Sequence, residues 1–124
     1  MIHLDTNFLI LAGRIGTAQA AQYNAWLVAG ERFAVSAMAW AVFQCGPATL
    51  VEVRTAMKMV EEVVPIMPAD ATKGAELFNL AGRRRGSLAD CLIAAVALRC
   101  GASPATENRA DFAPFVSAGL QVVP

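Results

Sequence analysis

The chain opens with the stretch that decides the fold, Met1-Ile2-His3-Leu4-Asp5-Thr6-Asn7-Phe8-Leu9-Ile10-Leu11. Short apolar runs of this kind are typical of buried strands in a parallel sheet that helices cover on both faces. Three polar residues, Asp5 to Asn7, interrupt the run where the strand should end. Ligands of open α/β sheets bind at the carboxyl ends of the strands, so Asp5 is either a turn residue or the first ligand of a site.

The composition indicates a globular chain with a large buried core and no net charge. The 124 residues suit one domain, residues 1–124, in which 56% of residues are hydrophobic and 16% are charged. Ten basic and ten acidic residues cancel, so the net charge gives no support for nucleic-acid binding. The sequence has no apolar run of the ~18 residues that a membrane span needs, and no signal-peptide pattern at its start. We therefore expect a cytoplasmic protein.

The three cysteines are expected to be buried thiols. They are odd in number, lack C-x-x-C spacing and lie among apolar residues, at Cys45, Cys91 and Cys100. This pattern predicts neither disulfides nor a zinc site.

Helical and extended patterns alternate after the first strand. Cap and turn residues predict five helices, at residues 17–29, 37–45, 47–63, 70–81 and 88–100, with Thr17, Ser36 and Ser87 as N-caps of three of them. Apolar runs predict further strands at 33–35, 63–68, 103–106 and 120–123. Such alternation predicts an α/β fold, a three-layer α/β/α sandwich around a short parallel sheet of four or five strands.

Three acidic residues have special settings in this arrangement. Asp5 follows the first strand, Asp90 lies in the apolar helix 88–100, and Asp111 comes after the late strand. Carboxylates that converge on one spot repel each other unless a cation lies between them, and oxygen ligands suit Mg²⁺ or Mn²⁺. A bound ion of this kind can activate a water and stabilise a displacement at phosphorus.

Each of these acids also has a purely structural interpretation. Asp5 can form an Asx-turn, Asp90 stands at capping-box spacing from Ser87, and Asp111 can be a loop or cap residue. The two interpretations of Asp90 are compatible, because a carboxylate in the first turn of a helix can still face the edge of the sheet.

A basic run, Arg83-Arg84-Arg85, directly precedes the helix that carries Asp90. It can favour the carboxyl end of helix 70–81, or contact an RNA phosphate backbone beside an acidic site. His3 is expected to be a packed histidine. The aromatic residues in helical patterns are expected in the core or at an interface; they are Tyr23, Trp26 and Trp40.

Four segments of the chain resemble segments that occur in the same order in PIN domains. The segment 2–7 is similar to the first strand of the family, 35–41 to the second strand and its helix, 85–95 to the helix with a central acid, and 105–112 to the late strand and its acidic turn. Length and motifs are most like VapC-type toxins of bacterial toxin–antitoxin pairs. The resemblance implies a Mg²⁺-dependent endoribonuclease that is a homodimer and is neutralised by a VapB-type antitoxin.

The resemblance also implies a site. Asp5, Asp90 and Asp111 would be the metal-binding, catalytic acids, with Thr6 and Asn108 as polar support. Members of the family differ in whether the late acid aligns with the position of Asn108 or of Asp111. The basic run 83–85 would contact the RNA, a tRNA or rRNA in a single-stranded or looped region where bases are accessible.

One position departs from the family pattern. The second acid, a Glu, normally lies on the helix after the second strand, and this chain has Val42 there. Valine cannot ligate a metal, and Gln44 lies about 200° further round the helix. We therefore expect reduced or no nuclease activity, whether the valine is natural or was selected during cloning of a toxic protein.

Two other function classes remain open at this point. One is a catalytically inactive PIN domain that only binds an antitoxin or RNA. The other is a small-molecule phosphatase, which is disfavoured because the sequence has no glycine-rich phosphate loop and no Cys-x₅-Arg arrangement.

Overall fold

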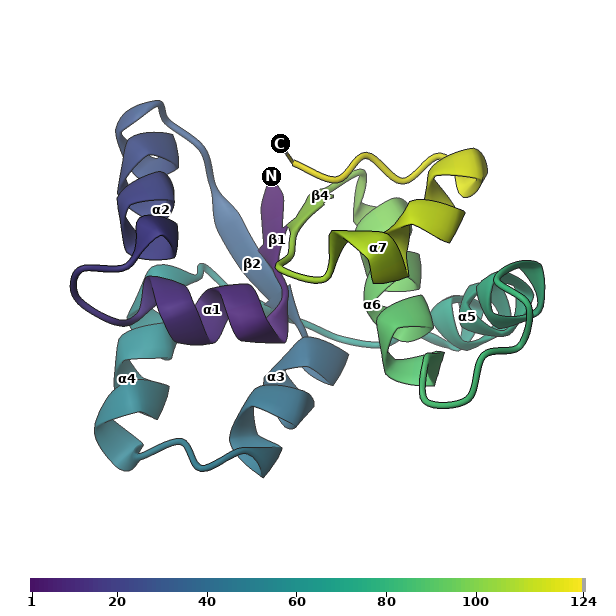
Figure 1. The fold of residues 1–124 in the computed structure, drawn as a ribbon, viewed down its shortest axis with the longest axis horizontal. Coiled ribbons are helices and arrows are strands. Elements are labelled where there is room, and N and C mark those ends of the chain that lie inside the picture. The colour runs from purple at the N-terminus through teal and green to yellow at the C-terminus, as the bar shows by residue number, and fades with distance from the viewer. Residues whose placement is uncertain (124) are drawn as a thin grey trace.

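A short parallel sheet lies at the centre of the computed structural model, which describes residues 1–123 (Figure 1). Its four strands are β1 (Ile2–Leu4), β2 (Phe33–Ser36), β3 (Val63–Val64) and β4 (Ser103–Ala105), in the order β3-β2-β1-β4. All neighbouring strands pair in parallel, and His3 in β1 is aligned with Ala34 of β2 and Pro104 of β4. The predicted α/β class and parallel sheet are confirmed.

Helices cover both faces of this sheet. They are α1 (Thr6–Ala12), α2 (Ala18–Val28), α3 (Ala37–Cys45), α4 (Leu50–Met59), α5 (Pro68–Leu80), α6 (Leu88–Cys100) and α7 (Arg109–Phe112), followed by the 3₁₀ helix η1 (Ala113–Ala118). Figure 1 shows α1, α2 and α4 on one side of the sheet and α5, α6 and α7 on the other. Within residues 1–123, no helix is long and apolar enough to span a membrane.

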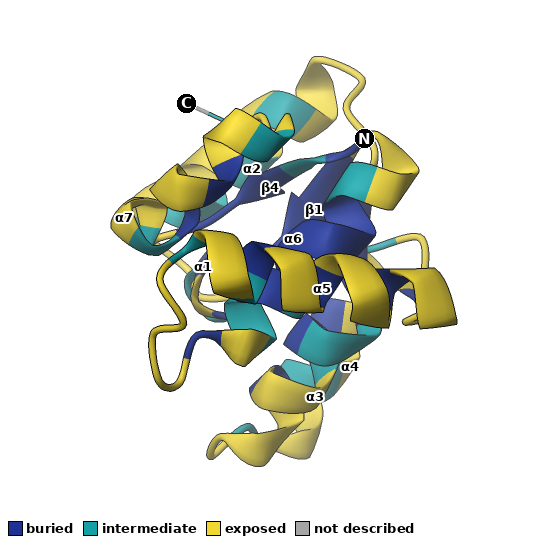
Figure 2. Cartoon of the chain, turned by 90° about the vertical axis from the view of Figure 1, so that its right-hand side faces the viewer, coloured by how far each residue is buried: buried dark blue, intermediate teal, exposed yellow. Residues whose placement is uncertain are grey.

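The central strands are buried on both faces, which explains why their sequences do not alternate between apolar and polar residues. In β2, Phe33 packs against Tyr23 and Trp26 of α2, with ring centroids 4.4 and 6.5 Å apart. The next residue, Ala34, contributes to a buried cluster with Val96 of α6. Figure 2 shows β1, β4 and much of α6 as buried, whereas α5 has an exposed outer face.

Two of the predicted N-caps are confirmed. The Thr17 hydroxyl accepts a hydrogen bond from the Ala20 N–H (3.0 Å) at the start of α2, and the Ser36 hydroxyl accepts one from the Ala39 N–H (3.1 Å) at the start of α3. Ser87 is also the N-cap residue of α6, as predicted, but it makes no side-chain cap bond. Its hydroxyl instead donates to the Arg84 carbonyl (2.7 Å).

Helix α1 was not predicted from the sequence. The apolar residues after Asn7 continue as a helix rather than as a connection, and the helix begins directly at Thr6. Asp5 makes this possible because its carboxylate accepts from the Thr6 N–H (2.8 Å). No loop therefore separates the end of β1 from the start of α1.

The expected final strand at 120–123 is wrong. These residues have no regular secondary structure, although the Val123 N–H donates to the Pro104 carbonyl (3.0 Å). Pro104 has no N–H to return, so a ladder cannot extend along this edge of β4. The parallel sheet thus has four strands, the lower of the two predicted numbers.

The predicted boundaries between residues 47 and 70 also shift. Helix α4 begins at Leu50 rather than Pro47, because Thr49 and Glu52 form a capping box there. The predicted strand 63–68 shrinks to Val63–Val64, since α5 already begins at Pro68.

His3 is a packed histidine, as expected, with an exposed fraction of 2%. Burial, followed by the positive charges of the N-terminus and Arg99, lowers the pKa of His3 to about 4. The imidazole is therefore neutral at physiological pH. Of the three cysteines only Cys91 is buried; Cys45 and Cys100 are exposed, so the expectation of three buried thiols is wrong for two of them.

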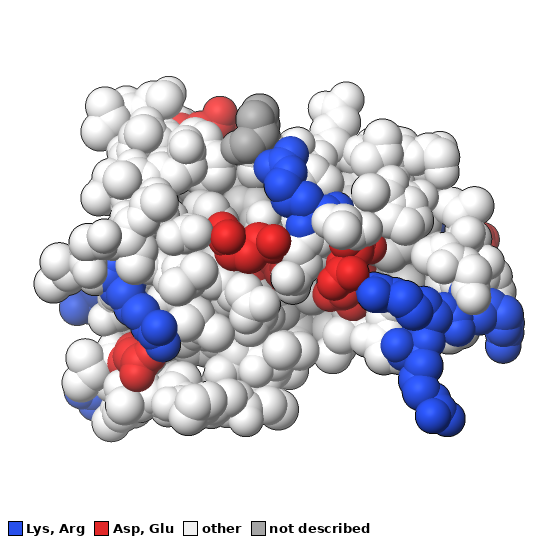
Figure 3. Space-filling view, viewed as in Figure 1, with Lys and Arg blue, Asp and Glu red and all other residues white. Residues whose placement is uncertain are grey.

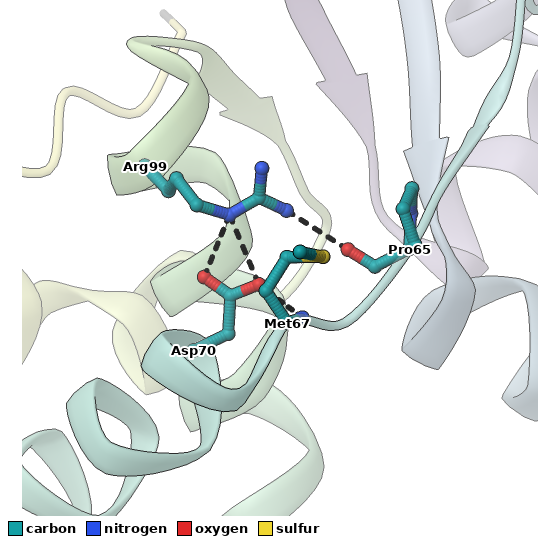
Figure 4. Close-up of polar contacts among 4 residues, drawn as sticks. All are labelled: Pro65, Met67, Asp70 and Arg99. Atoms are coloured by element: carbon teal, nitrogen blue, oxygen red, sulfur yellow. Dashed lines mark hydrogen bonds and ion pairs between the residues drawn. The ribbon is translucent and has the colours of Figure 1, made fainter.

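An ion pair holds α5 against α6. The Nε of Arg99 donates to both carboxylate oxygens of Asp70 (2.9 and 3.0 Å), and its guanidinium also donates to the Pro65 carbonyl (2.8 Å) (Figure 4). Asp70 is 1% exposed and also accepts from the Met67 N–H (2.8 Å). Burial pushes the pKa of Asp70 upward, but the Arg99 and Met67 hydrogen bonds and the Arg99 charge bring it below its ordinary value.

Replacing Arg99 with alanine should lower the free energy of unfolding by about 2 kcal/mol at neutral pH, because Asp70 stays buried without its counter-charge. A lowered folded-state pKa contributes stability above the unfolded value of about 3.9, and this contribution is lost as the pH falls through the folded-state pKa. Urea unfolding at pH 7 and pH 3 measures both effects.

The matched control is Lys73→Ala, which removes the exposed Lys73–Glu76 pair (3.1 Å) and should change stability by less than about 0.5 kcal/mol. A loss for Arg99→Ala that is as large at pH 3 as at pH 7 would contradict the assignment.

Candidate active site

Asp5 lies at the carboxyl end of β1 and is 3% exposed. One of its oxygens accepts from the Thr6 N–H (2.8 Å) and the other from the Thr106 hydroxyl (2.8 Å). Burial raises the pKa of Asp5, while these two hydrogen bonds oppose the shift and the charge of Asp111 adds to it. The structural and functional interpretations of Asp5 are compatible, because the carboxylate that caps α1 also sits at the ligand-binding edge of the sheet.

The polar partner of Asp5 is Thr106 rather than the side chain of Thr6. The Thr6 hydroxyl points to a different element and donates to the Ala39 carbonyl of α3 (3.0 Å). Sequence reasoning missed Thr106, although its position directly after β4, the strand next to β1, was an available signal. Thr106 also accepts from the Asn108 N–H (2.9 Å), which places Asn108 beside the same edge.

Asp90 lies in the first turn of α6 and is half-buried. Burial, followed by the charges of Asp5 and Asp111, raises the pKa of Asp90 to about 6, and the charge of Arg84 opposes this shift. The charges of Asp5 and Asp111 both act on Asp90, so the three acids that the sequence singled out lie in one region of the molecule. Within residues 1–123, however, they do not form a group tight enough to hold a metal ion.

Asp111, in α7, forms an ion pair with Arg84 (3.1 Å). Figure 3 shows acidic and basic side chains next to each other near the middle of this face of the molecule. Among residues 1–123, the other two arginines of the run 83–85 do not form ion pairs with the acids of the site. Arg83 has φ of +58°, lies over the Phe78 ring and donates to the Asn79 side chain of α5, so it belongs to the end of that helix. Arg85 is exposed.

Val42, which the resemblance assigns to the position of the second acid, lies on α3. It comes three residues after Ala39, whose carbonyl accepts from the Thr6 hydroxyl. Its side chain is 38% exposed. The aliphatic side chain at this position supplies no metal ligand.

The family model described as PIN domain matches residues 2–113. The chain belongs to the PIN domain family. PIN domains are generally nucleases that use divalent metal ions. The sequence matches no curated protein.

Solved structures of other PIN proteins have the same fold. FitAcB from Neisseria gonorrhoeae is 23% identical, with a TM-score of 0.72, over 100% of this chain and 97% of that chain. VapBC2 from Rickettsia felis, bound to a DNA fragment from its promoter, is 20% identical, with a TM-score of 0.75, over 99% and 98%. Mycobacterium tuberculosis VapC20, described as a sarcin-ricin loop cleaving toxin, is 17% identical, with a TM-score of 0.69, over 99% and 98%. At these identities the likeness establishes the fold.

The carboxylates of this PIN domain are the type of ligand that a hard divalent cation prefers, but too few of them are grouped together. Carboxylate oxygens are suitable ligands, and the repulsion that raises the pKa of Asp90 is what a cation would relieve. However, no three His, Cys, Asp or Glu side chains within residues 1–123 are grouped so as to hold a metal ion. Asp111 is instead paired with Arg84, and position 42 supplies no further carboxylate.

Replacing Arg84 with glutamine should therefore raise the affinity for Mn²⁺ about fivefold, because it frees Asp111 and removes a positive charge near the site. Titration calorimetry or electron paramagnetic resonance measures this affinity without any cleavage assay. Arg85→Gln is the matched control, with the same charge change one residue away, and should have a smaller effect. Equal effects of the two variants would mean that the Arg84–Asp111 pair does not compete with the cation.

Proposed function

We propose that this PIN domain is a VapC-type toxin, a Mg²⁺-dependent endoribonuclease that hydrolyses RNA phosphodiesters, and that Val42 leaves it with reduced or no activity. The observation that supports the proposal is the position of Asp5 at the carboxyl end of β1 in a PIN-domain sheet, near enough to Asp90 for the charges of Asp5 and Asp111 to raise the pKa of Asp90. An acidic cluster of this kind suits a cation that binds phosphate oxygens.

The residues of the chain have separate roles in this proposal. Asp5 and Asp90 would hold Mg²⁺ or Mn²⁺, and Asp111 would join them when Arg84 leaves it. The bound ion would activate a water and stabilise negative charge on the phosphate. Thr106 holds the Asp5 carboxylate in place through its 2.8 Å hydrogen bond, so it is a positioning residue.

Binding of the RNA would rest on groups around the acids. Arg85 is exposed and available to contact the phosphate backbone, and Arg84 would become available on leaving Asp111, whereas Arg83 is engaged with α5. Thr6 and Asn108 would support the site indirectly: Thr6 fixes α1 against α3, and Asn108 lies beside Thr106. The RNA would be a tRNA or rRNA, cut where its bases are unpaired.

The proposed partners are a VapB-type antitoxin and a second copy of the chain. The neighbours that support the antitoxin are toxin–antitoxin assemblies, among them VapBC2 and a toxin–antitoxin complex from Klebsiella pneumoniae. An antitoxin segment would neutralise the acidic site by placing a basic side chain against it.

A second candidate function is a PIN domain that binds an antitoxin or RNA without cleaving. The observation that favours it is the incomplete acid set: Val42 replaces one acid and Asp111 is engaged with Arg84. In that case neither Mg²⁺ nor Mn²⁺ should raise the melting temperature of the protein.

Restoring the acid with Val42→Glu should raise cleavage of total tRNA and rRNA by about 100-fold or more in Mg²⁺ or Mn²⁺, because it adds a metal ligand and a water-activating group. The double variant Val42→Glu, Asp90→Asn should be inactive. Gel analysis of the cleavage products measures the rates.

The control is Val28→Glu, which adds the same charge at an 89% exposed position of α2 and should leave cleavage at the parent level. If the parent protein cleaves RNA as fast as Val42→Glu does, the proposal that Val42 lowers the activity is refuted. No cleavage and no Mn²⁺ binding by any variant would refute the nuclease and leave the binding function.

A further inference from the structure

A cavity of about 170 Å³ opens beside the acidic site and plays no part in the proposed chemistry. It lies between α1 and α2 on one side and the end of β4 and α7 on the other. Its chemically important lining residues are Phe8, Gln22, Trp26, Thr106, Glu107 and Arg109. This volume is well below the roughly 300–1,000 Å³ of pockets that take drug-sized molecules, so it suits a single small ring system.

Thr106 belongs to both the cavity and the acidic site. Its hydroxyl donates to Asp5 at 2.8 Å, and the same residue lines the cavity wall. A group bound in the cavity would therefore be separated from Asp5 by the Thr106 side chain alone. A phosphate at the acidic site and a base in the cavity can thus belong to one RNA strand.

The cavity has an aromatic wall. Phe8 and Trp26 stack with centroids 5.5 Å apart and an angle of 29° between their planes. Trp26 packs against the core, as expected from the sequence, but remains only partly buried, and its remaining surface lines the cavity. Exposed aromatic surface of this kind is where proteins stack unpaired bases of single-stranded RNA.

Charged and amide groups line the rest of the cavity. Arg109 donates one hydrogen bond to the Val123 carbonyl (2.7 Å), which orients its guanidinium, and Glu107 is an exposed carboxylate two residues away. Gln22 adds an amide with both donor and acceptor atoms. Guanine matches this set best: its O6 and N7 accept from arginine, and its N1–H and amino group can donate to a carboxylate.

We propose that this cavity binds one unpaired guanine of the RNA substrate, next to the phosphate held at the acidic site. The proposal rests on the proposed ribonuclease function and adds the base specificity of the same site. Glu107 and Arg109 would be the residues that determine specificity, and Trp26 the stacking surface.

Intrinsic fluorescence tests this directly, because Trp26 is one of two tryptophans. In a Trp40→Phe protein, Trp26 is the sole reporter. We expect a uridine hexamer with a single central guanosine to quench its fluorescence in EDTA and to bind about tenfold more tightly than the all-uridine hexamer. Glu107→Gln should remove most of this preference, and Gln22→Ala should weaken binding of the guanosine hexamer.

Asn24→Ala is the matched control, since Asn24 is exposed on the same helix and does not line the cavity. Thermal melting of each variant shows that it is folded. Equal affinities for the two hexamers, or equal effects of Gln22→Ala and Asn24→Ala, would overturn the guanine site. Because the assay contains no metal, failure here leaves RNA cleavage by Val42→Glu unaffected, and loss of that cleavage leaves the fluorescence result standing.

Discussion

The carboxylate of Asp5 is the constraint on which the arrangement of this PIN domain depends. It is almost completely buried, yet both of its oxygens are satisfied: one by the first N–H of α1 and the other by Thr106 at the end of β4. A single side chain thus joins the central strand, the helix that follows it and a strand about 100 residues later in the chain. The other acids of the site are positioned relative to this fixed point.

Much of the fold could be predicted from the sequence because helix caps and apolar strands are encoded by residues that lie close together in the chain. Thr17 and Ser36 cap helices within three residues, and β2 is recognisable from its apolar run. Helix α1 was missed because it has only seven residues and all of those after Asn7 are apolar, so its sequence shows no amphipathic periodicity. The Asp70–Arg99 pair was missed for a different reason, since its members lie 29 residues apart and only the packing of α5 on α6 brings them together.

The acids of the candidate site were found from sequence, but their surroundings were not. Asp5, Asp90 and Asp111 stand out because each follows or begins a recognisable element. Thr106 and the pairing of Arg84 with Asp111 depend on side-chain directions that no spacing rule gives. These surroundings set the electrostatics: three carboxylates repel each other, one arginine offsets part of that charge, and Val42 adds none. The chain therefore tolerates its acidic site in the absence of a cation more easily than a four-acid site would.

The two edge strands of the sheet affect how this protein can bind other proteins. At one border, β4 contains Pro104, and the Pro104 carbonyl is already occupied by the Val123 N–H. At the other border, β3 has only two residues. Within residues 1–123, each border therefore offers at most a short run of unpaired backbone groups, which disfavours extension of the sheet by an added strand. Recognition through helix surfaces and side chains is favoured instead, and the short edges also disfavour edge-to-edge aggregation.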